Sequence, residues 1–219
     1  MLTDPEEIKI IANARQKNVA DPRRSREHFV RIYEDFFNDI TFTGKQMLDL
    51  GPGQSDFGEL AKKRGGLTYG IDNDPCVVEL GNYKGFPSVH GDLKKISKGM
   101  FDTNFDGLFC KYSINAFWFH DKPGKLEEHI GELVSLLNPG GWAWIAPWNG
   151  VPKKADLSEA EIQGVLDLQI ALFKAAGFQA IDLTDELTKY YGVHGVTANN
   201  ALFLLNIPVP QKLSGYSLL

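Results

Sequence analysis

The chain has 219 residues, 43% of them hydrophobic, and a formal net charge of −5 at pH 7. This length suits one domain with a single core of ordinary size. The negative charge argues against an extended nucleic-acid-binding surface, and the chain has no apolar run long enough to predict a membrane span.

The cysteines and the N-terminus bear on the compartment. Cys76 and Cys110 stand far apart without C-x-x-C spacing, so we expect reduced thiols, no disulfide and no metal site. The N-terminus lacks the basic and apolar regions of a signal peptide. These features predict a cytoplasmic protein, and they leave its oligomeric state open.

Residues 1–44 are predicted to form an N-terminal helical arm. Thr3-Asp4-Pro5 is a typical helix start, and the segment 21–26 breaks the helical pattern. A second helix is expected from about Ser25 to Phe37, with an aromatic stripe that includes Tyr33. One interpretation is that this stripe packs on the remaining domain, residues 45–219.

A strand, a glycine turn and a helix follow the arm. The apolar run Met47–Leu50 predicts a buried strand that ends at Gly51, and helical spacing resumes near Phe57. Gly51 and Gly53 allow a tight turn and a close approach of the backbone to a ligand. This arrangement is typical of the opening of a nucleotide-binding α/β unit.

Acidic residues around the turn indicate the kind of ligand. Asp56 stands where a dinucleotide fingerprint needs a small residue, at a helix start that would otherwise hold a pyrophosphate. Asp49 adds a second negative charge beside Gly51. A ligand with positive character fits this turn better than NAD does, and S-adenosylmethionine carries both a sulfonium and an ammonium.

The segment Asp49-Leu50-Gly51-Pro52-Gly53 resembles the first motif of the class I S-adenosylmethionine-dependent methyltransferases. The resemblance implies that Asp49, Gly51, Pro52 and Gly53 bind S-adenosylmethionine, with S-adenosylhomocysteine as the product. It also implies a Rossmann-like, doubly wound α/β sheet of seven strands, mostly parallel with an antiparallel last strand. Matches extend over about residues 45 to 207.

The second predicted strand, 67–71, ends in Asp72-Asn73-Asp74. An acid about 20 residues past the glycines can accept hydrogen bonds from both ribose hydroxyls, and the resemblance assigns Asp72 that role, with Asn73 beside it. Asp74 precedes Pro75 and is expected to cap the next helix. The cluster lacks further partners at metal-ligand spacing, so no metal is expected.

Two further strand ends are predicted to face the cleft. Asp92, with Leu93 after it, matches the family position that contacts the adenine amino group, although Gly91-Asp92 is also common turn chemistry. Lys111 to Asn115 follow the fourth strand, where ligands of open α/β sheets bind. This segment lacks the Asn/Asp/Ser-Pro-Pro-aromatic pattern of many nitrogen methyltransferases and the acid-rich segment of aminopropyltransferases, so it is similar to the broad small-molecule group.

The last third of the chain supports the fold. Asn138-Pro139-Gly140-Gly141 is expected to stop a helix and to precede the fifth strand, 142–146. A sixth strand is expected at 180–183, an insert at 184–196, and a last strand at 201–205. The family places that last strand antiparallel between strands five and six.

Methyl transfer needs donor and acceptor held in line in a dry pocket, and a base helps when the acceptor is a hydroxyl. The candidate bases are Tyr112, His120, Tyr190 and His194. In the family, residues before the first strand often close over the site, which gives a lid as the second interpretation of the arm. The residues predicted to contact the acceptor are Tyr33, Arg24, Tyr112, Asn115, Trp118 and Trp148.

We therefore predict a methyltransferase that acts on oxygen or nitrogen of a small molecule. Three alternatives remain: a nicotinamide oxidoreductase, a methyltransferase acting on protein or RNA, and a non-catalytic nucleotide-binding α/β protein. The oxidoreductase conflicts with Asp56 and with the proline-glycine-glycine and last-strand pattern. A basic groove outside the arm would favour a protein or RNA substrate, and the sequence shows none.

Overall fold

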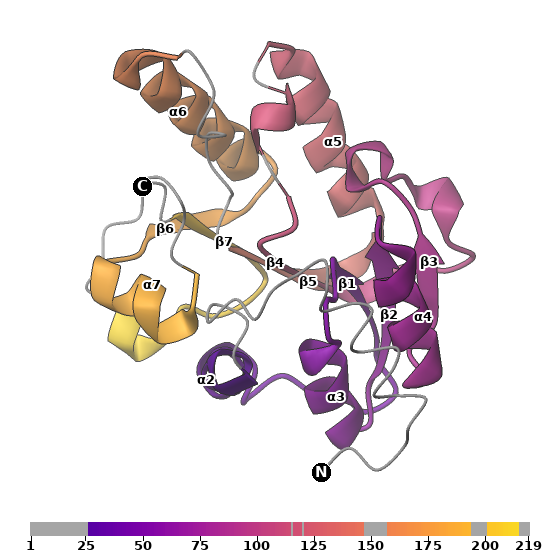
Figure 1. The fold of residues 1–219 in the computed structure, drawn as a ribbon. Coiled ribbons are helices and arrows are strands. Elements are labelled where there is room, and N and C mark those ends of the chain that lie inside the picture. The colour runs from indigo at the N-terminus through magenta and orange to yellow at the C-terminus, as the bar shows by residue number, and fades with distance from the viewer. Residues whose placement is uncertain (1–25, 115, 120, 147–156, 194–200, 215–219) are drawn as a thin grey trace.

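A computed structural model describes residues 26–114, 116–119, 121–146, 157–193 and 201–214. Its described strands form one sheet of seven in the order β3-β2-β1-β4-β5-β7-β6 (Figure 1). All neighbours pair in parallel except β7, which is antiparallel to both β5 and β6. The predicted fold class is confirmed. The strands are β1 (Gln46–Leu50), β2 (Leu67–Asp72), β3 (Ser88–His90), β4 (Phe105–Lys111), β5 (Leu137–Ala146), β6 (Gln179–Asp182) and β7 (Ala201–Leu205).

Helices cover both faces of the sheet (Figure 1). On one face lie α5 (Pro123–Ser135) and α6 (Glu159–Ala175), and on the other lie α2 (Arg26–Phe36), α3 (Asp56–Lys63) and α7 (Asp185–Tyr191). The helix α4 (Pro75–Tyr83) connects β2 to β3. The shorter 3₁₀ segments are η2 (Leu93–Lys95), η3 (Lys98–Met100), η4 (Ala116–Phe119) and η5 (Gln211–Leu213).

Successive side chains along each strand point to opposite faces of the sheet, so the core consists of two apolar layers. Leu108 and Cys110 of β4 face the layer under α5 and α6, whereas Phe109 faces the layer under α2 and α3. On that second side the ring of Phe109 stacks on Phe57 at 4.2 Å and on Trp144 at 4.9 Å. The stacked rings tie α3 to the middle of the sheet.

The described part of the arm is core. On α2, Ile32, Tyr33 and Phe36 are buried, and Phe37 just after the helix is fully buried. They pack with Phe42 and Phe57, and Phe36 also contacts Tyr191 of α7. The interpretation of the aromatic stripe as packing is thus confirmed for residues 26–44, and the predicted helix near Thr3 lies outside the described residues.

One expectation about the later elements is corrected, and a second one is completed. The strand β5 begins at Leu137, so the Asn138–Gly141 segment belongs to the strand and is not a turn before it. Leu137 pairs with Phe105, and a register shift between Phe105 and Gly107 accommodates the irregular start. The predicted insert 184–196 contains α7, which Thr184 caps through a hydrogen bond from the Leu187 N–H.

Among the described residues, no helix is both long enough and apolar enough to span a membrane.

Candidate functional site

The glycine turn between β1 and α3 has the backbone geometry that the sequence indicates. Gly51 and Gly53 have φ of +73° and +56°, in the left-handed region. A Cβ at Gly51 would lie 1.9 Å from Oγ of Ser113, so no other residue fits there without movement. Ser55 also adopts a left-handed conformation, at φ +63°, before α3 begins at Asp56. Ser113 therefore occupies the space where a side chain at position 51 would lie, and the turn requires glycine there.

A cavity of about 730 Å³ lies at the carboxyl ends of β1 to β4. This is the edge where open α/β sheets bind ligands, and the volume suits a nucleoside-sized molecule with room beside it. The residues that line it are Gly51, Gly53, Asp72, Asn73, Asp74, Val77, His90, Gly91, Asp92, Leu93, Lys94, Tyr112, Ser113 and Trp118.

Backbone N–H groups hold the carboxylates of this cavity in place. Asp72 Oδ1 accepts a hydrogen bond from the Asp74 N–H at 2.9 Å. Asp74 caps α4 as predicted, accepting from the Cys76 N–H at 2.9 Å. Asp92 accepts from the Lys94 N–H at 3.0 Å and starts η2. The turn interpretation of Asp92 is thus correct, and it is compatible with ligand contact because Asp92 also lines the cavity.

A second, smaller cavity of about 30 Å³ lies beside the glycine turn. It shares Gly51, Gly53 and Tyr112 with the large cavity. Its remaining wall comes from β1, α3, β4 and the arm helix α2. The residues that line it are Phe29, Asp49, Gly51, Pro52, Gly53, Gln54, Asp56, Phe109, Lys111 and Tyr112.

Buried charges surround the small cavity. Burial raises the pKa of Asp49 well above its ordinary value, and the nearby charges of Asp72 and Asp56 raise it further. Burial also raises the pKa of Asp56, while Arg26 opposes that rise. Lys111 is only 7% exposed, and its ammonium lies 4.9 Å from the ring centroid of Phe29. Burying a charged side chain away from water costs free energy, and a bound ligand group of opposite charge offsets part of that cost.

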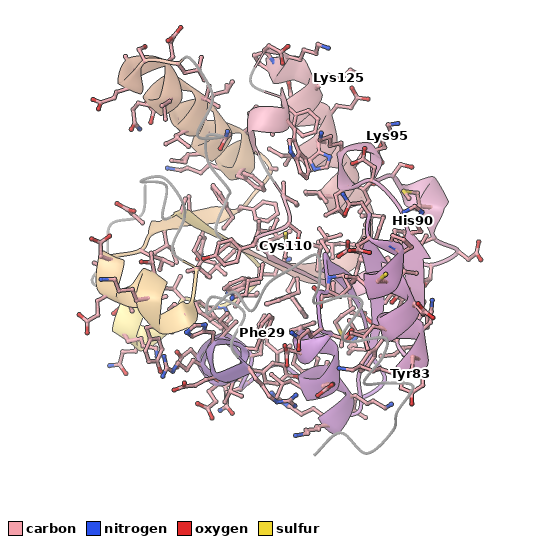
Figure 2. The ribbon with its side chains drawn as sticks, in the orientation of Figure 1. Phe29, Tyr83, His90, Lys95, Cys110 and Lys125 are labelled. Carbon is pink, nitrogen blue, oxygen red and sulfur yellow. The ribbon has the colours of Figure 1, made fainter. Side chains whose placement is uncertain are left out.

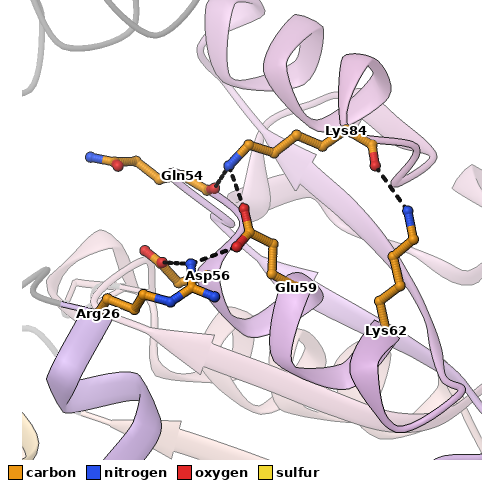
Figure 3. Close-up of polar contacts among 6 residues, drawn as sticks. All are labelled: Arg26, Gln54, Asp56, Glu59, Lys62 and Lys84. Atoms are coloured by element: carbon orange, nitrogen blue, oxygen red, sulfur yellow. Dashed lines mark hydrogen bonds and ion pairs between the residues drawn. The ribbon is translucent and has the colours of Figure 1, made fainter. Parts of the chain in front are cut away.

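Ion pairs connect the start of α2 to the glycine turn (Figure 3). Arg26 Nη1 lies 2.5 Å from Glu59 Oε2 and 3.4 Å from Asp56 Oδ1. Lys84 Nζ lies 2.7 Å from Glu59 Oε1 and donates to the Gln54 carbonyl at 2.8 Å. The expectation that Asp56 repels a phosphate assumed an unpaired carboxylate, and the Arg26 contact weakens that argument.

The residues predicted to bind the donor all line one of the two cavities. Among the predicted acceptor residues, Tyr112 and Trp118 line the large cavity. Tyr33 is buried in the aromatic cluster, its ring 5.2 Å from that of Phe42, and is absent from the lining of both cavities. The remaining predictions Arg24, Asn115, His120, Trp148 and His194 lie outside the described residues.

The two described candidate bases occupy different places. Tyr112 lines both cavities and has a positive φ of 69°, which turns the chain sharply after β4. Tyr190, which lies on α7, packs against the side chains of Arg31 and Lys212. It lines neither of the two cavities. Only Tyr112 of this pair is placed to reach a bound ligand.

Several lining residues were missed by the sequence analysis. His90 pairs with Asp72 in the β2–β3 register, and one of its ring nitrogens lies 3.1 Å from the Asn73 carbonyl oxygen. Its place at a strand end was a usable signal. Phe29, in contrast, belongs to the aromatic stripe that the lid interpretation places over the cleft, and it lines the small cavity. Figure 2 labels both residues: His90 lines the large cavity and Phe29 the small one.

Within the described ranges, no group of three or more His, Cys, Asp or Glu side chains is arranged to hold a metal ion. Cys110 is buried in the core, and burial raises the pKa of its thiol to about 12. Such a thiol stays protonated and unreactive at neutral pH, so Cys110 serves as a packing residue of the core.

Comparison with known proteins gives matches at the level of structure. No protein-family profile and no curated protein sequence matches the chain. Among solved structures, a TehB-like SAM-dependent methyltransferase from Corynebacterium glutamicum superposes with a TM-score of 0.52 at 17% identity, over 95% of this chain and 100% of the other.

Two further solved structures are similar. A SAM-dependent methyltransferase from Geobacter sulfurreducens, in complex with S-adenosyl-L-homocysteine, gives a TM-score of 0.52 at 20% identity over 87% of this chain and 79% of the other. Fibrillarin from Aeropyrum pernix, with natively bound S-adenosyl-L-methionine, gives a TM-score of 0.50 at 13% identity over 82% of this chain and 76% of the other. These similarities establish a shared fold.

Proposed function

We propose that this chain, which has the fold of the class I S-adenosylmethionine-dependent methyltransferases, transfers a methyl group from S-adenosylmethionine to oxygen or nitrogen of a small molecule. The observation that carries the proposal is one cavity that gathers the glycine turn, Asp72 and Asp92 at the carboxyl ends of neighbouring strands. A nucleoside needs carboxylate and backbone acceptors at this edge of the sheet, and all are present.

The residues present fit the donor. Gly51 and Gly53 line the cavity, and glycine at position 51 lets Ser113 pack against the turn, where a Cβ would collide with it. Asp72 would accept hydrogen bonds from the ribose hydroxyls, and Asp92 would contact the adenine amino group. Trp118 lines the same cavity as Asp92, with the Lys94 ammonium 5.0 Å from its ring centroid. Trp118 therefore stays a predicted contact of the acceptor, on the wall of the cavity that Asp92 shares.

The strand order separates this proposal from a nicotinamide oxidoreductase. A dinucleotide-binding sheet has the order 3-2-1-4-5-6, whereas here the antiparallel β7 lies between β5 and β6. The buried carboxyl group of Asp49 near the turn also favours a cationic ligand over a pyrophosphate.

The protein's part in the reaction is chiefly to hold the reactants and exclude water. The bound donor supplies a methyl group on a sulfonium, so no covalent intermediate with the protein is required. Correct placement can contribute about 7–11 kcal/mol to lowering the barrier. Tyr112, which lines both cavities, is the described candidate for accepting a proton from a hydroxyl acceptor.

Composition supports a small acceptor. The net charge of −5 disfavours an extended RNA-binding surface. The segment after β4 lacks the patterns of nitrogen methyltransferases that act on bases or amides.

Calorimetry on the full chain tests the donor. We expect S-adenosylmethionine and S-adenosylhomocysteine to bind at micromolar concentrations and NAD to give no heat. Binding of NAD, with no response to either sulfur nucleoside, would overturn the proposal. A second assay follows methyl transfer from labelled donor into a cell extract divided into small-molecule, protein and RNA fractions. Label in the protein or RNA fraction alone would replace the small acceptor with a macromolecule.

A further inference from the structure

The glycine turn between β1 and α3 holds a conformation that its own residues do not favour throughout. Gly53 tolerates its φ of +56°, but Ser55 adopts a φ of +63° without being a glycine. The Ser55 hydroxyl is buried and has no hydrogen-bond partner among the described residues. Left-handed backbone at such a residue persists only where the surrounding structure enforces it. The contacts around Ser55 therefore decide whether the turn keeps its shape.

One peptide unit of the turn is held at both ends. This unit joins the carbonyl of Gln54 to the N–H of Ser55. The Ser55 N–H donates to the Pro52 carbonyl at 2.8 Å. The Gln54 carbonyl accepts a hydrogen bond from Nζ of Lys84, also at 2.8 Å. Because the peptide unit is planar, these two bonds together restrain its orientation and, with it, the φ angle of Ser55.

Lys84 reaches the turn from the end of α4, and Glu59 holds its ammonium (Figure 3). Lys84 Nζ lies 2.7 Å from Glu59 Oε1, and the other oxygen, Oε2, lies 2.5 Å from Nη1 of Arg26. Burial alone would raise the pKa of Glu59, but the hydrogen bonds from Lys84 and Arg26 outweigh it and lower that pKa. The carboxylate therefore stays charged at neutral pH and restricts where the ammonium of Lys84 can lie.

The turn that Lys84 supports contributes to both cavities. Gly51 and Gly53 line both of them, and Gln54 lines the small one. Lys84 itself lines neither of the two. When a ligand binds only one conformation of a site, its apparent affinity falls with the fraction of molecules in that conformation. Support of the turn can thus set ligand affinity without a direct contact.

We propose that Lys84 is a positioning residue for the methyl donor, because its hydrogen bond to the Gln54 carbonyl keeps the glycine turn in the shape that receives the nucleoside. Glu59 orients Lys84. Through Glu59, the contact of Arg26 ties the first turn of the arm helix α2 to the same support, so donor binding is coupled to the docking of that turn. This inference rests on the proposed function.

Amide hydrogen exchange tests the turn without a ligand. Lys84→Met keeps the length of the side chain and removes the ammonium. In this variant the Ser55 amide should exchange about 10-fold faster than in the unmodified protein, as loss of a hydrogen bond from a charged group predicts. The Gly70 amide, which donates to the Pro87 carbonyl at 2.9 Å in another part of the sheet, is the internal reference and should keep its rate.

Calorimetry with S-adenosylhomocysteine on the full chain measures the consequence for the donor. Lys84→Met should weaken binding about 10-fold, and Lys84→Arg, which keeps a charged donor at this place, should stay within about 3-fold of the unmodified protein. Lys63→Met is the matched control. Lys63 is exposed at the end of α3 that lies away from the turn, so this variant removes the same charge and should leave the affinity unchanged.

A double-mutant cycle tests the route from the arm. Arg26→Met alone should weaken binding of S-adenosylhomocysteine by about 3-fold, within the range of a partly exposed ion pair. Added to Lys84→Met, it should cause little further loss, because the arm then has no lysine to orient. Side chains that act separately give additive losses, so additivity would overturn the coupling of the arm to the turn.

Two results would overturn the role of Lys84. One is a folded Lys84→Met variant with unchanged affinity for S-adenosylhomocysteine, and the other is equal acceleration of exchange at Ser55 and Gly70. If Lys84→Met does not fold, Glu59→Gln puts the same question, because a neutral amide holds Lys84 less firmly. Unchanged affinity in that variant would also overturn the inference. Absence of binding by the unmodified protein would end the proposed function, whereas unchanged affinity in the variants ends this inference alone.

Discussion

Individual side chains at the strand ends carry the ligand chemistry, and Asp72 is the most direct to test. One of its oxygens already accepts the Asp74 N–H, which orients the carboxylate at the cavity. Asp72→Ala should weaken binding of S-adenosylhomocysteine by about 1–3 kcal/mol through loss of charge-assisted hydrogen bonds. Calorimetry measures the change.

Asp74→Asn is the control for that experiment, because asparagine keeps the helix cap while removing the charge. Its affinity should stay close to that of the unmodified protein. An unchanged dissociation constant in folded Asp72→Ala, with a loss in Asp74→Asn, would transfer the ribose contact to Asp74.

Asp49 gives a prediction about pH. Burial raises its pKa in the folded protein, so the folded state binds this proton more tightly than the unfolded chain does. Its contribution to stability therefore falls as pH rises above the unfolded pKa of roughly 3.9, until Asp49 has ionised in the folded protein. Asparagine does not ionise, so Asp49→Asn should abolish this loss of stability at higher pH. The variant should be more stable than the unmodified protein at pH 7 and similar to it near pH 4.

Urea unfolding of both proteins at pH 4, 5.5 and 7 measures that difference, since other titrating groups are common to both. The same variant should bind the donor more weakly, because a cationic ligand loses a carboxylate. A constant difference across the three pH values would contradict the assignment of the shifted pKa to Asp49.

At the scale of elements, α2 decides whether the arm is core or lid. Phe36 is 2% exposed. Its ring contacts the ring of Trp144 edge to face and that of Tyr191 at a tilt. Phe36→Ala should lower the free energy of unfolding by about 3–5 kcal/mol, as a large cavity in a packed core does. Glu34→Ala, at an exposed position on the same helix, should change it by less than about 0.5 kcal/mol.

A mobile lid would respond differently. Its removal or truncation would cost little stability and would mainly loosen ligand binding. If Phe36→Ala melts like the unmodified protein, α2 is not part of the core in solution. The lid remains a prediction for the segment before Arg26, and limited proteolysis at Arg23 and Arg24 with and without S-adenosylhomocysteine tests it there.

For the whole molecule, the two apolar layers and the site form one connected unit. The cavities take residues from four strands and from α2, α3 and α4, so the unfolded chain has no binding site. A ligand at 100 times its dissociation constant should stabilise the fold by about 2.7 kcal/mol. For a chain of this size that corresponds to a rise in Tm of roughly 5–10 °C.

Differential scanning calorimetry should show one transition that shifts with S-adenosylhomocysteine. A second transition that does not move would mean that residues 1–44 unfold separately from residues 45–219, as a domain boundary at that place would require. We expect one transition, because Tyr33, Phe36 and Phe37 share a core with Phe57 and Trp144.

The glycine turn and the acids at the strand ends were predictable from the residue pattern, whereas the seven-stranded sheet with its antiparallel strand was implied by the family resemblance. Apolar runs punctuated by glycine specify parallel strands, and the carboxyl ends of such strands meet at one edge, so Asp49, Asp72 and Asp92 could be brought together without coordinates. The tertiary structure alone decided that Arg26 pairs with Asp56, that Phe29 faces Lys111 and that α2 is core. These contacts join segments 30 or more residues apart through side-chain packing, and an amphipathic stripe shows that a helix has a buried face without showing what covers it.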